Sequence, residues 1–277
     1  MAATPPHRHA LAALVPDWKA SPRVRAFVTG RHGGVSRGIW GLDGGSVGGL
    51  NLGAGCGDEP HSVDVNRRRL AIGLPSAPVW LHQVHGVAVH VAEATGPDDP
   101  AKAIPEAVAA DAAVTACPAR VLAVLTADCL PVFLADRDGR AIGVAHAGWR
   151  GLSGGVLENA VAALRELLPA NAPLLAWLGP AIGPDAFEVG RDVVEAFCDT
   201  DPGCQNAFVP GSRPDKWFAD LYRLARRRLS IAGVEEIGGG GFCTFTDREC
   251  FWSYRREPPA GRMASVIWIE PGSTSGA

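Results

Sequence analysis

The sequence predicts an α/β fold built in layers within a single domain. Continuous apolar runs such as 121–125 and 141–145 are typical of strands buried on both faces. Segments with apolar positions at helical spacing alternate with these runs, and no linker-like stretch interrupts the 277 residues. Hydrophobic residues make up 47% of the chain, which is enough for a sizeable core. We therefore expect one catalytic domain at 21–270, with a disordered N-terminal segment at 1–20 and a disordered tail at 271–277.

The first part of the chain predicts a strand, a glycine-rich connection and a helix. Residues 24–29 predict a strand, and 30–38 predict a turn that contains Arg31. The dense glycines of 43–57, with Asn51 in their midst, indicate that the backbone passes close to another segment. The elements expected next are a helix at 62–72, a strand at 79–91 and a loop at 95–107.

The middle of the chain predicts a β-hairpin with chemical groups at its open end. Short strands are expected at 109–115 and 121–125. Two further apolar runs, 131–135 and 140–145, flank a turn with an Asp-Gly pair, which is a strong hairpin signal. Cys129 precedes the first run and His146 follows the second. Both side chains should therefore emerge at the same end of the hairpin.

The last part of the chain predicts alternating helices and strands. These are helices at 152–168, 192–199 and 216–232 and strands at 174–178, 251–254 and 263–269. The N-terminus of the first helix offers free backbone N–H groups beside the permanent cation of Arg150. We expect an anion such as phosphate to fit there.

Two imidazoles and one thiol form a candidate metal site. His82 and His85 are three residues apart, so in an extended chain their rings point to opposite faces and only one can join the site. His85, followed by a glycine at a turn, is better placed. Together with Cys129 and His146 it supplies three nitrogen and sulfur donors, which resemble a catalytic zinc site whose open position holds water or substrate. Thiolate and imidazole also suit copper, so the identity of the metal stays open.

Composition narrows the partners and the compartment. A net charge of −3 gives no electrostatic reason to expect nucleic acid or an anionic membrane, and no apolar run approaches membrane-spanning length. Seven cysteines at irregular spacing argue against a disulfide framework and for a reducing compartment. The N-terminal residues lack a signal-peptide core. We expect a cytoplasmic protein that acts on small molecules.

Eight short segments in order along the chain resemble one known family. They are residues 30–36, 51–53, 83–86, 110–111, 126–131, 146–151, 179–180 and 253–256. Together they are similar to the laccase-domain (YfiH-like) purine nucleoside phosphorylase family, historically labelled multicopper polyphenol oxidase and also peptidoglycan editing factor. The resemblance spans about 26–269. One departure is the stretch 184–189, which is often cysteine-rich with a tyrosine in relatives, so roles of those residues do not transfer.

The resemblance implies a layered sandwich of mixed β-sheets flanked by helices and a zinc-dependent enzyme. Its activity would be phosphorolysis of adenosine, inosine and methylthioadenosine to purine base and ribose 1-phosphate, with adenosine deamination as a side activity. By motif match the zinc ligands and catalytic residues would be His85, Cys129 and His146. The partners would be a purine nucleoside and phosphate, without nucleic acid or membrane, and the protein a monomer or weak homodimer.

Further roles follow from the chemistry of the neighbouring residues. Asp128 is a catalytic candidate that would manage protons or orient a ligand histidine, as would Asp111. The expected substrate contacts are Arg31, Asn51 and Arg150. Each residue also has a structural interpretation, since aspartates cap turns and arginines pair with surface carboxylates.

Rival functions stay open at this stage. A cysteine hydrolase with Cys129 as nucleophile and His146 as base is chemically reasonable, as is editing of peptidoglycan precursors in the same cleft. A copper polyphenol oxidase is disfavoured, because a multicopper site needs many His-x-His ligands, and the chain has eight histidines with no such pair inside the domain. A non-enzymatic binding module is disfavoured by the open coordination position.

Overall fold

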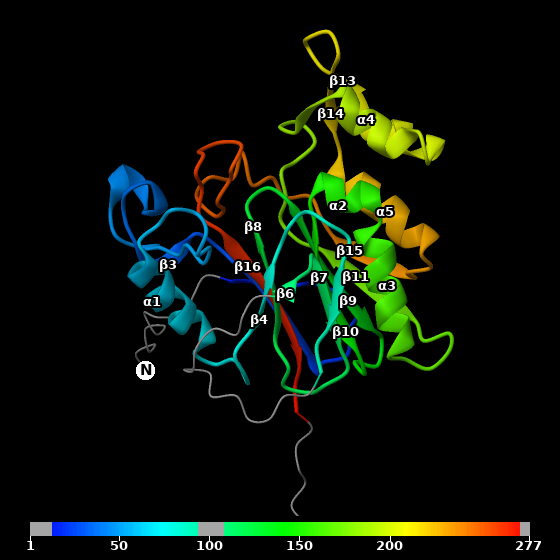
Figure 1. The fold of residues 1–277 in the computed structure, drawn as a ribbon, viewed down its shortest axis with the longest axis horizontal. Coiled ribbons are helices and arrows are strands. Elements are labelled where there is room, and N and C mark those ends of the chain that lie inside the picture. Colours follow the sequence, from blue (N-terminus) through cyan, green and yellow to red (C-terminus); the bar gives the residue numbers. More distant parts are fainter. Residues whose placement is uncertain (1–12, 94–107, 272–277) are drawn as a thin grey trace, which may run out of the picture.

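Two six-stranded β-sheets pack face to face in the computed structural model, which describes residues 13–93 and 108–271 (Figure 1). The first sheet has the order β1 (Ala13–Leu14), β2 (Val24–Thr29), β16 (Met263–Ile269), β8 (Leu122–Thr126), β4 (Val79–His82) and β6 (Val108–Ala109). The second has the order β15 (Glu236–Gly239), β11 (Leu174–Leu178), β9 (Leu130–Asp136), β10 (Ile142–Ala147), β7 (Ala112–Thr115) and β5 (Val89–Val91). Both mix parallel and antiparallel pairs.

Helices cover the outer faces of the two sheets and complete four layers. α1 (Pro60–Ala71) lies on the first sheet, and α3 (Val156–Glu166) and α5 (Leu221–Ile231) lie on the second (Figure 1). Along β9, Phe133 faces the first sheet while Val132 faces the helices. Both faces of the strand are therefore buried, which explains its continuous apolar run. The predicted layered α/β sandwich with mixed sheets and flanking helices is confirmed.

A small third sheet stands at one end of the sandwich. It consists of β12 (Glu188–Gly190), β14 (Lys216–Ala219) and β13 (Phe208–Pro210), next to α4 (Arg191–Cys198) and the 3-10 helix η3 (Pro202–Ala207) (Figure 1). Cys198 and Cys204 are joined by a disulfide between α4 and η3, whereas the other five cysteines are free. The sequence argued against a disulfide framework, and this one pair is local: the chain turns back after α4 and brings the two Cα atoms to 5.8 Å.

Three connections cross from the first sheet to the second at the same end of the sandwich. They join β4 to β5, β6 to β7 and β8 to β9. Because β4 pairs in parallel with both β6 and β8, the three strands point the same way and their connections leave at one edge. The connections carry His85, Asp111 and Cys129, so the fold gathers these residues from distant parts of the chain.

These crossings also break elements that the sequence predicted as continuous. The predicted strand 79–91 is β4 and β5 with His85 between them in a left-handed conformation (φ 60°). The predicted strand 109–115 is likewise split into β6 and β7 around Asp111. The residues on both sides of each break are strand-like, although β6 and β5 lie at sheet edges and are exposed or half-buried.

Three other expectations about single elements are corrected. The helix predicted at 152–168 is interrupted by Gly155 (φ 102°), so that α2 (Trp149–Gly154) ends where α3 begins. The helix predicted at 216–232 starts with β14, which pairs with β12 and β13, and α5 begins only after the Asp220 cap. Residues 251–254 form no strand; Phe251 and Trp252 pack in a separate apolar cluster, and Tyr254 is exposed.

The glycine-rich N-terminal region has more regular structure than predicted. The expected turn at 30–38 contains β3 (His32–Ser36), and two short 3-10 helices follow, η1 (Gly38–Trp40) and η2 (Asp43–Gly45). Residues 13–20 fell in the segment expected to be disordered, but β1 pairs with β2 and Trp18 packs against the core. The loop expected at 95–107 lies outside the described residues. In the described part of the chain, no helix has the length and apolar character needed to cross a membrane.

Candidate metal centre and substrate cleft

The three predicted ligands meet where the sheets are joined. His85 lies on the connection after β4, Cys129 directly precedes β9, and His146 is the last but one residue of β10. Their donor atoms all lie within 4.8 Å of one another, and Cys129 Sγ is 3.7 Å from His85 Nε2. Among the residues that the structure describes, this is the one cluster of its kind. Cys129 and His146 were predicted to emerge at the same end of the hairpin, and the pairing of His146 with Pro131 confirms this.

A glycine allows the histidine ring to approach the hairpin. A Cβ atom at Gly148 would lie 2.9 Å from the His85 ring and 3.0 Å from the Cys129 sulfur, closer than real Cβ contacts allow. The His85 ring also stands edge-on to the His146 ring, with centroids 4.8 Å apart. A larger residue at 148 would therefore push the ligands apart.

Asp111 orients both histidines from behind. Its Oδ1 accepts a hydrogen bond of 2.8 Å from His146 Nδ1 and another of 2.9 Å from the backbone N–H of His85. Its Oδ2 accepts from the backbone N–H groups of Val84 (3.2 Å) and Gly86 (2.7 Å). Because a carboxylate can only accept, His146 must donate through Nδ1, which leaves Nε2 for the site. This carboxylate–histidine arrangement is typical of metal centres.

The buried groups of the site favour a thiolate and an imidazolium. Burial by itself would raise the pKa of the Cys129 thiol, but the charges and hydrogen bonds of His146 and then His85 lower the pKa to about 6. Burial would lower the pKa of His146, but Cys129 and Asp111 raise the pKa to about 9. The pKa of Asp111 is lowered despite burial, chiefly by its hydrogen bond from His146. The sulfur is therefore held in the form that binds metals.

The donor types and the distance from Cys129 Sγ to His85 Nε2 fit a zinc ion with an open position. Ligand atoms at zinc bond lengths of about 2.0–2.3 Å are separated by roughly 3.3–3.8 Å, and the sulfur–nitrogen distance of 3.7 Å falls in this range. The donor set is two imidazoles and a thiolate, and His85 is exposed while His146 is buried. A fourth ligand can therefore come from the open side.

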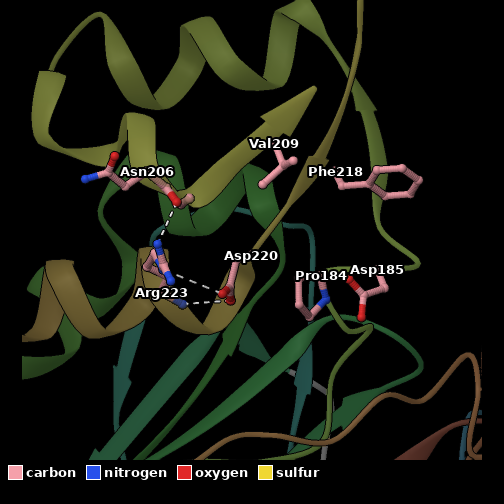
Figure 2. Close-up of a pocket in the computed structure, with 8 residues that line it drawn as sticks. Pro184, Asp185, Asn206, Val209, Phe218, Asp220 and Arg223 are labelled. Carbon is pink, nitrogen blue, oxygen red and sulfur yellow. Dashed lines mark hydrogen bonds and ion pairs between the residues drawn. The ribbon is translucent and has the colours of Figure 1, made fainter. Parts of the chain in front are cut away.

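The triad opens into a cleft of about 810 Å³, within the range of about 300–1,000 Å³ of small-molecule sites. Besides the triad, its wall contains aromatic rings and arginines: Trp80, Trp149, Phe187, Tyr254, Arg67, Arg255 and Arg262. A second hollow of about 510 Å³ lies near the third sheet (Figure 2). There Arg223 is engaged by Asp220 and by the backbone oxygen of Asn206. The cleft at the triad is the better candidate site.

Asp128 joins the cleft wall to the metal side. Its backbone is left-handed (φ 85°), its Oδ1 accepts from Thr244 Oγ1 at 2.6 Å, and its Oδ2 accepts from the backbone N–H of Arg255 at 2.6 Å. Its backbone oxygen accepts from Ile182 N–H at 2.9 Å. Asp128 lines the cleft, but both carboxylate oxygens hold other segments, so a positioning role fits this geometry better than proton transfer.

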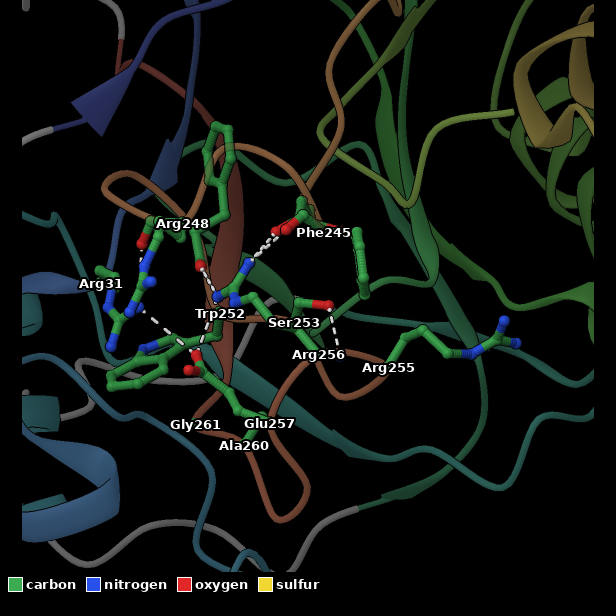
Figure 3. A network of polar contacts seen from close by, with 12 residues as sticks. Arg31, Phe245, Arg248, Trp252, Ser253, Arg255, Arg256, Glu257, Ala260 and Gly261 are labelled. Carbon is green, nitrogen blue, oxygen red and sulfur yellow. Dashed lines mark hydrogen bonds and ion pairs between the residues drawn. The ribbon is translucent and has the colours of Figure 1, made fainter. Parts of the chain in front are cut away.

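The predicted substrate contacts lie behind or outside the cleft wall. Arg31 is buried, lies 4.2 Å above the Trp252 ring and pairs with Glu257 (Figure 3). Asn51 is also buried, and its Oδ1 accepts from the backbone of Arg262 at 2.9 Å. Arg150 is exposed and lies 4.3 Å above the ring of Trp149. Their direct contact with substrate stays a prediction that this placement does not support.

The arginines that do line the cleft were missed as substrate contacts. Arg67, on α1, lies 4.4 Å above the Trp80 ring, and its pKa is lowered by burial. Arg262 precedes β16, with its guanidinium 5.7 Å from the Tyr254 ring centre, and Arg255 lies 5.5 Å from that of Phe187. On the sequence, Arg67 is part of a solvated-looking helix face and the other two are loop residues. Only the fold shows that they line the same cleft as the triad.

Comparisons with known proteins agree with the fold and identify the family. Residues 25–270 match the family described as multi-copper polyphenol oxidoreductase laccase. The chain is 48% identical over 257 residues to a purine nucleoside phosphorylase of Pseudomonas aeruginosa, covering 93% of this chain and 98% of that protein. It is 48% identical over 258 residues to the purine nucleoside phosphorylase YfiH of Escherichia coli, covering 92% and 98%. A crystal structure from Neisseria meningitidis has a TM-score of 0.81 at 42% identity, with 94% and 99% covered.

Proposed function

This chain belongs to the multi-copper polyphenol oxidoreductase laccase family, and we propose that it is a zinc-dependent purine nucleoside phosphorylase. The observation that carries the proposal is the group of His85, Cys129 and His146 at the base of a cleft lined by arginines and aromatic rings. Relatives that the chain matches over nearly its full length bear the name of this activity. The proposed substrates are adenosine, inosine and methylthioadenosine, with phosphate as the second reactant.

The metal would be held by His85, Cys129 and His146, with Asp111 fixing the orientation of His146. A zinc ion bound there supplies a Lewis acid with one position open to a reactant. The residues fit zinc in donor type and spacing. A copper ion would find the same three donors, so the metal is part of what the experiment must identify.

Arginines in the cleft provide the charge that phosphate requires. Arg67 is held by its Nε donating to the backbone oxygen of Leu52 at 2.9 Å, and Arg262 by Nη1 donating to that of Ala260 at 2.6 Å. A Cβ at Gly53 would meet both Cys56 and Arg262, so these residues pack together at one side of the cleft. We place phosphate at this side, because guanidinium groups bind its oxygens in pairs and hold it for attack on the ribose.

Aromatic side chains provide the surface that a purine requires. Phe187 and Trp149 line the cleft near the triad, and Tyr254 is 54% exposed there. A flat ring binds a purine by stacking. Stacking also shields the glycosidic bond from water, which favours phosphate over water as the nucleophile. Adenosine deamination as a side activity belongs to the same proposal, since adenosine would occupy the same cleft.

The family description does not decide between oxidase and phosphorylase. Multicopper chemistry needs several copper ions held by many histidines, whereas the described residues contain one three-donor cluster. We therefore keep polyphenol oxidation as the disfavoured alternative. A cytoplasmic location and a monomeric or weakly dimeric state remain predictions.

A second candidate function rests on one specific observation. Cys129, His146 and Asp111 are arranged as nucleophile, base and orienting carboxylate, with the Cys129 pKa lowered to about 6. A cysteine hydrolase, such as one that edits peptidoglycan precursors, would use this arrangement without metal. His85 beside the sulfur favours the metal site, because a hydrolase triad has no use for a second imidazole at 3.7 Å.

The decisive assay follows phosphate-dependent release of purine bases. Purified protein loaded with zinc is given inosine, adenosine or methylthioadenosine with and without phosphate, before and after chelation. We expect base and ribose 1-phosphate only with phosphate, a loss of at least about a hundredfold after chelation, and recovery with zinc. Equal release without phosphate would indicate a hydrolase. Undiminished turnover in the metal-stripped protein would support the cysteine mechanism instead.

A further inference from the structure

Arg255 is a cleft arginine with few protein partners. Its side chain donates one hydrogen bond, from Nη1 to the backbone oxygen of Glu188 at 3.1 Å, and lies over the Phe187 ring. Among the described residues, no carboxylate forms an ion pair with it, whereas its neighbour Arg256 is paired with Glu257. Figure 3 shows the Arg255 side chain pointing away from the polar network around Arg256. Its donors are thus available to a ligand in the cleft.

The backbone at this position is fixed from two sides. Arg255 N–H donates to Asp128, the residue that precedes the ligand Cys129. Arg256 donates to the backbone oxygens of Thr244, Phe245 and Phe251, which fastens the next turn of the loop (Figure 3). The backbone of Arg255 is therefore held at a set position relative to the metal site, and the exposed side chain extends from it into the cleft.

The position of the Arg255 guanidinium over the Phe187 ring suits a flat purine base better than it suits phosphate. Arg67 and Arg262 lie together on the side of Gly53 and Cys56, where the proposed function places phosphate. Arg255 belongs to the other group, formed with Phe187 next to Asp128 and the triad. A planar cation that stacks on an aromatic ring presents its donors in one plane. The matching ligand is a flat molecule with two acceptors on one edge.

We propose that Arg255 determines base specificity and selects 6-oxopurine nucleosides over 6-aminopurine nucleosides. A 6-oxopurine such as hypoxanthine offers O6 and N7 as two neighbouring acceptors, the pair to which arginine binds with both arms of its fork. Adenine offers N7 beside an amino group, and arginine has no acceptor for that donor. The same two hydrogen bonds stabilise the negative charge that reaches the purine as the bond to ribose breaks.

This inference rests on the proposed function but goes beyond it to the identity of the base. Its test compares kcat/KM for phosphorolysis of inosine and adenosine in zinc-loaded wild type, Arg255→Gln and Arg255→Lys. A bidentate pair discriminates by roughly tenfold to a hundredfold, so we expect Arg255→Gln to lower the inosine value by that factor and the adenosine value by less than about threefold. Lysine keeps the charge but not the fork, so Arg255→Lys should lose most of the inosine preference as well.

The matched control is Arg191→Gln. Arg191 also lies 5.5 Å from the centre of an aromatic ring, that of Trp217, but it pairs with Asp215 and is not among the cleft residues. This variant should keep the wild-type ratio. Equal losses for both nucleosides in Arg255→Gln, no loss for either, or full rescue by lysine would overturn the proposal.

A binding measurement distinguishes failure of this inference from failure of the proposed phosphorylase activity. Calorimetric titration of inosine and adenosine into zinc-loaded protein without phosphate measures base preference without turnover. Tighter binding of inosine that depends on Arg255 supports the inference even if no phosphorolysis occurs, in which case only the proposed function fails. A different result contradicts the inference alone: phosphorolysis occurs, but wild type and Arg255→Gln each bind the two nucleosides equally and have the same kcat/KM ratio.

Discussion

Two buried aspartates organise the two halves of the site in different ways. Asp111 accepts four hydrogen bonds from the metal side, one from the His146 ring and three from the backbone of 84–86. Asp128 instead accepts from Thr244 and Arg255, which belong to the loop that forms the cleft wall. The first aspartate therefore sets the ligands, and the second attaches the substrate wall to them.

Adjacency in the sequence therefore does not decide which part of the site a residue holds in place. Asp128 is next to the ligand Cys129, yet its carboxylate reaches residues more than a hundred positions away. Asp111 is 26 and 35 positions from the two histidines that it orients. Metal binding and substrate binding should accordingly be separable by substitution at these two positions.

The largest effect is expected for Asp111→Asn. Asparagine has one oxygen, so either His146 or the backbone N–H groups of Val84 and Gly86 must face an NH2 group. We expect metal affinity to fall about 10- to 100-fold, turnover to fall with it, and the free energy of unfolding to decrease by about 2–4 kcal/mol. Competitive chelator titration and urea denaturation measure these changes. An unaltered metal affinity would remove Asp111 from the centre.

A smaller and different effect is expected for Asp128→Asn. Asparagine keeps one oxygen for two donors, the Thr244 hydroxyl and the Arg255 N–H, so the attachment of Arg255 loosens. The geometry of the three ligands is retained. We expect roughly a tenfold increase in KM for the nucleoside, with zinc content unchanged. Steady-state kinetics together with elemental analysis distinguish this from Asp111→Asn. Loss of zinc in both variants would show that the two aspartates do not act separately.

The smallest effect concerns the reactivity of the thiol. In metal-stripped protein the Cys129 thiolate fraction rises with pH through a pKa of about 6, below the ordinary thiol value, so alkylation should accelerate about tenfold from pH 5 to 7 and then level off. Asp111→Asn should shift this midpoint upwards, because Asp111 helps to keep His146 charged, and Asp128→Asn should not. Iodoacetamide labelling followed by peptide mass spectrometry reports on Cys129 alone. A midpoint near pH 8.5 in wild type would contradict the thiolate assignment.

Local sequence patterns were enough to predict the hairpin, but they did not predict the connections between the two sheets. The apolar runs around the Asp-Gly turn predict β9 and β10, and their register places Cys129 near His146. At His85 and Asp128 a non-glycine residue adopts the left-handed conformation. Gly86 indicates a turn after His85, but nothing local shows that the chain passes to the other sheet there. Strand 216–219 reads as helix because its apolar spacing fits both, and pairing with β12 and β13 decides.

For the site, the metal donors could be predicted and the substrate wall could not. Cysteine and histidine beside buried strands are rare enough to stand out, whereas arginines are common on surfaces. Arg31 seemed suited to a substrate contact by its glycine-rich setting, but it is buried on Trp252. Arg255 gave no such signal, because it lies on an irregular loop whose position depends on Asp128 and on the Arg256 network.

The proposed chemistry depends on Cys129, His85 and His146 binding one divalent metal ion. Elemental analysis of natively purified wild type, Cys129→Ser and Cys117→Ser tests it directly, since Cys117 is a free cysteine that is not among the cleft residues. We predict close to one zinc per chain in wild type and Cys117→Ser, and a loss of most of the metal in Cys129→Ser. Full activity of metal-free wild type, or equal metal content in all three proteins, would contradict a metal-dependent site at these three residues.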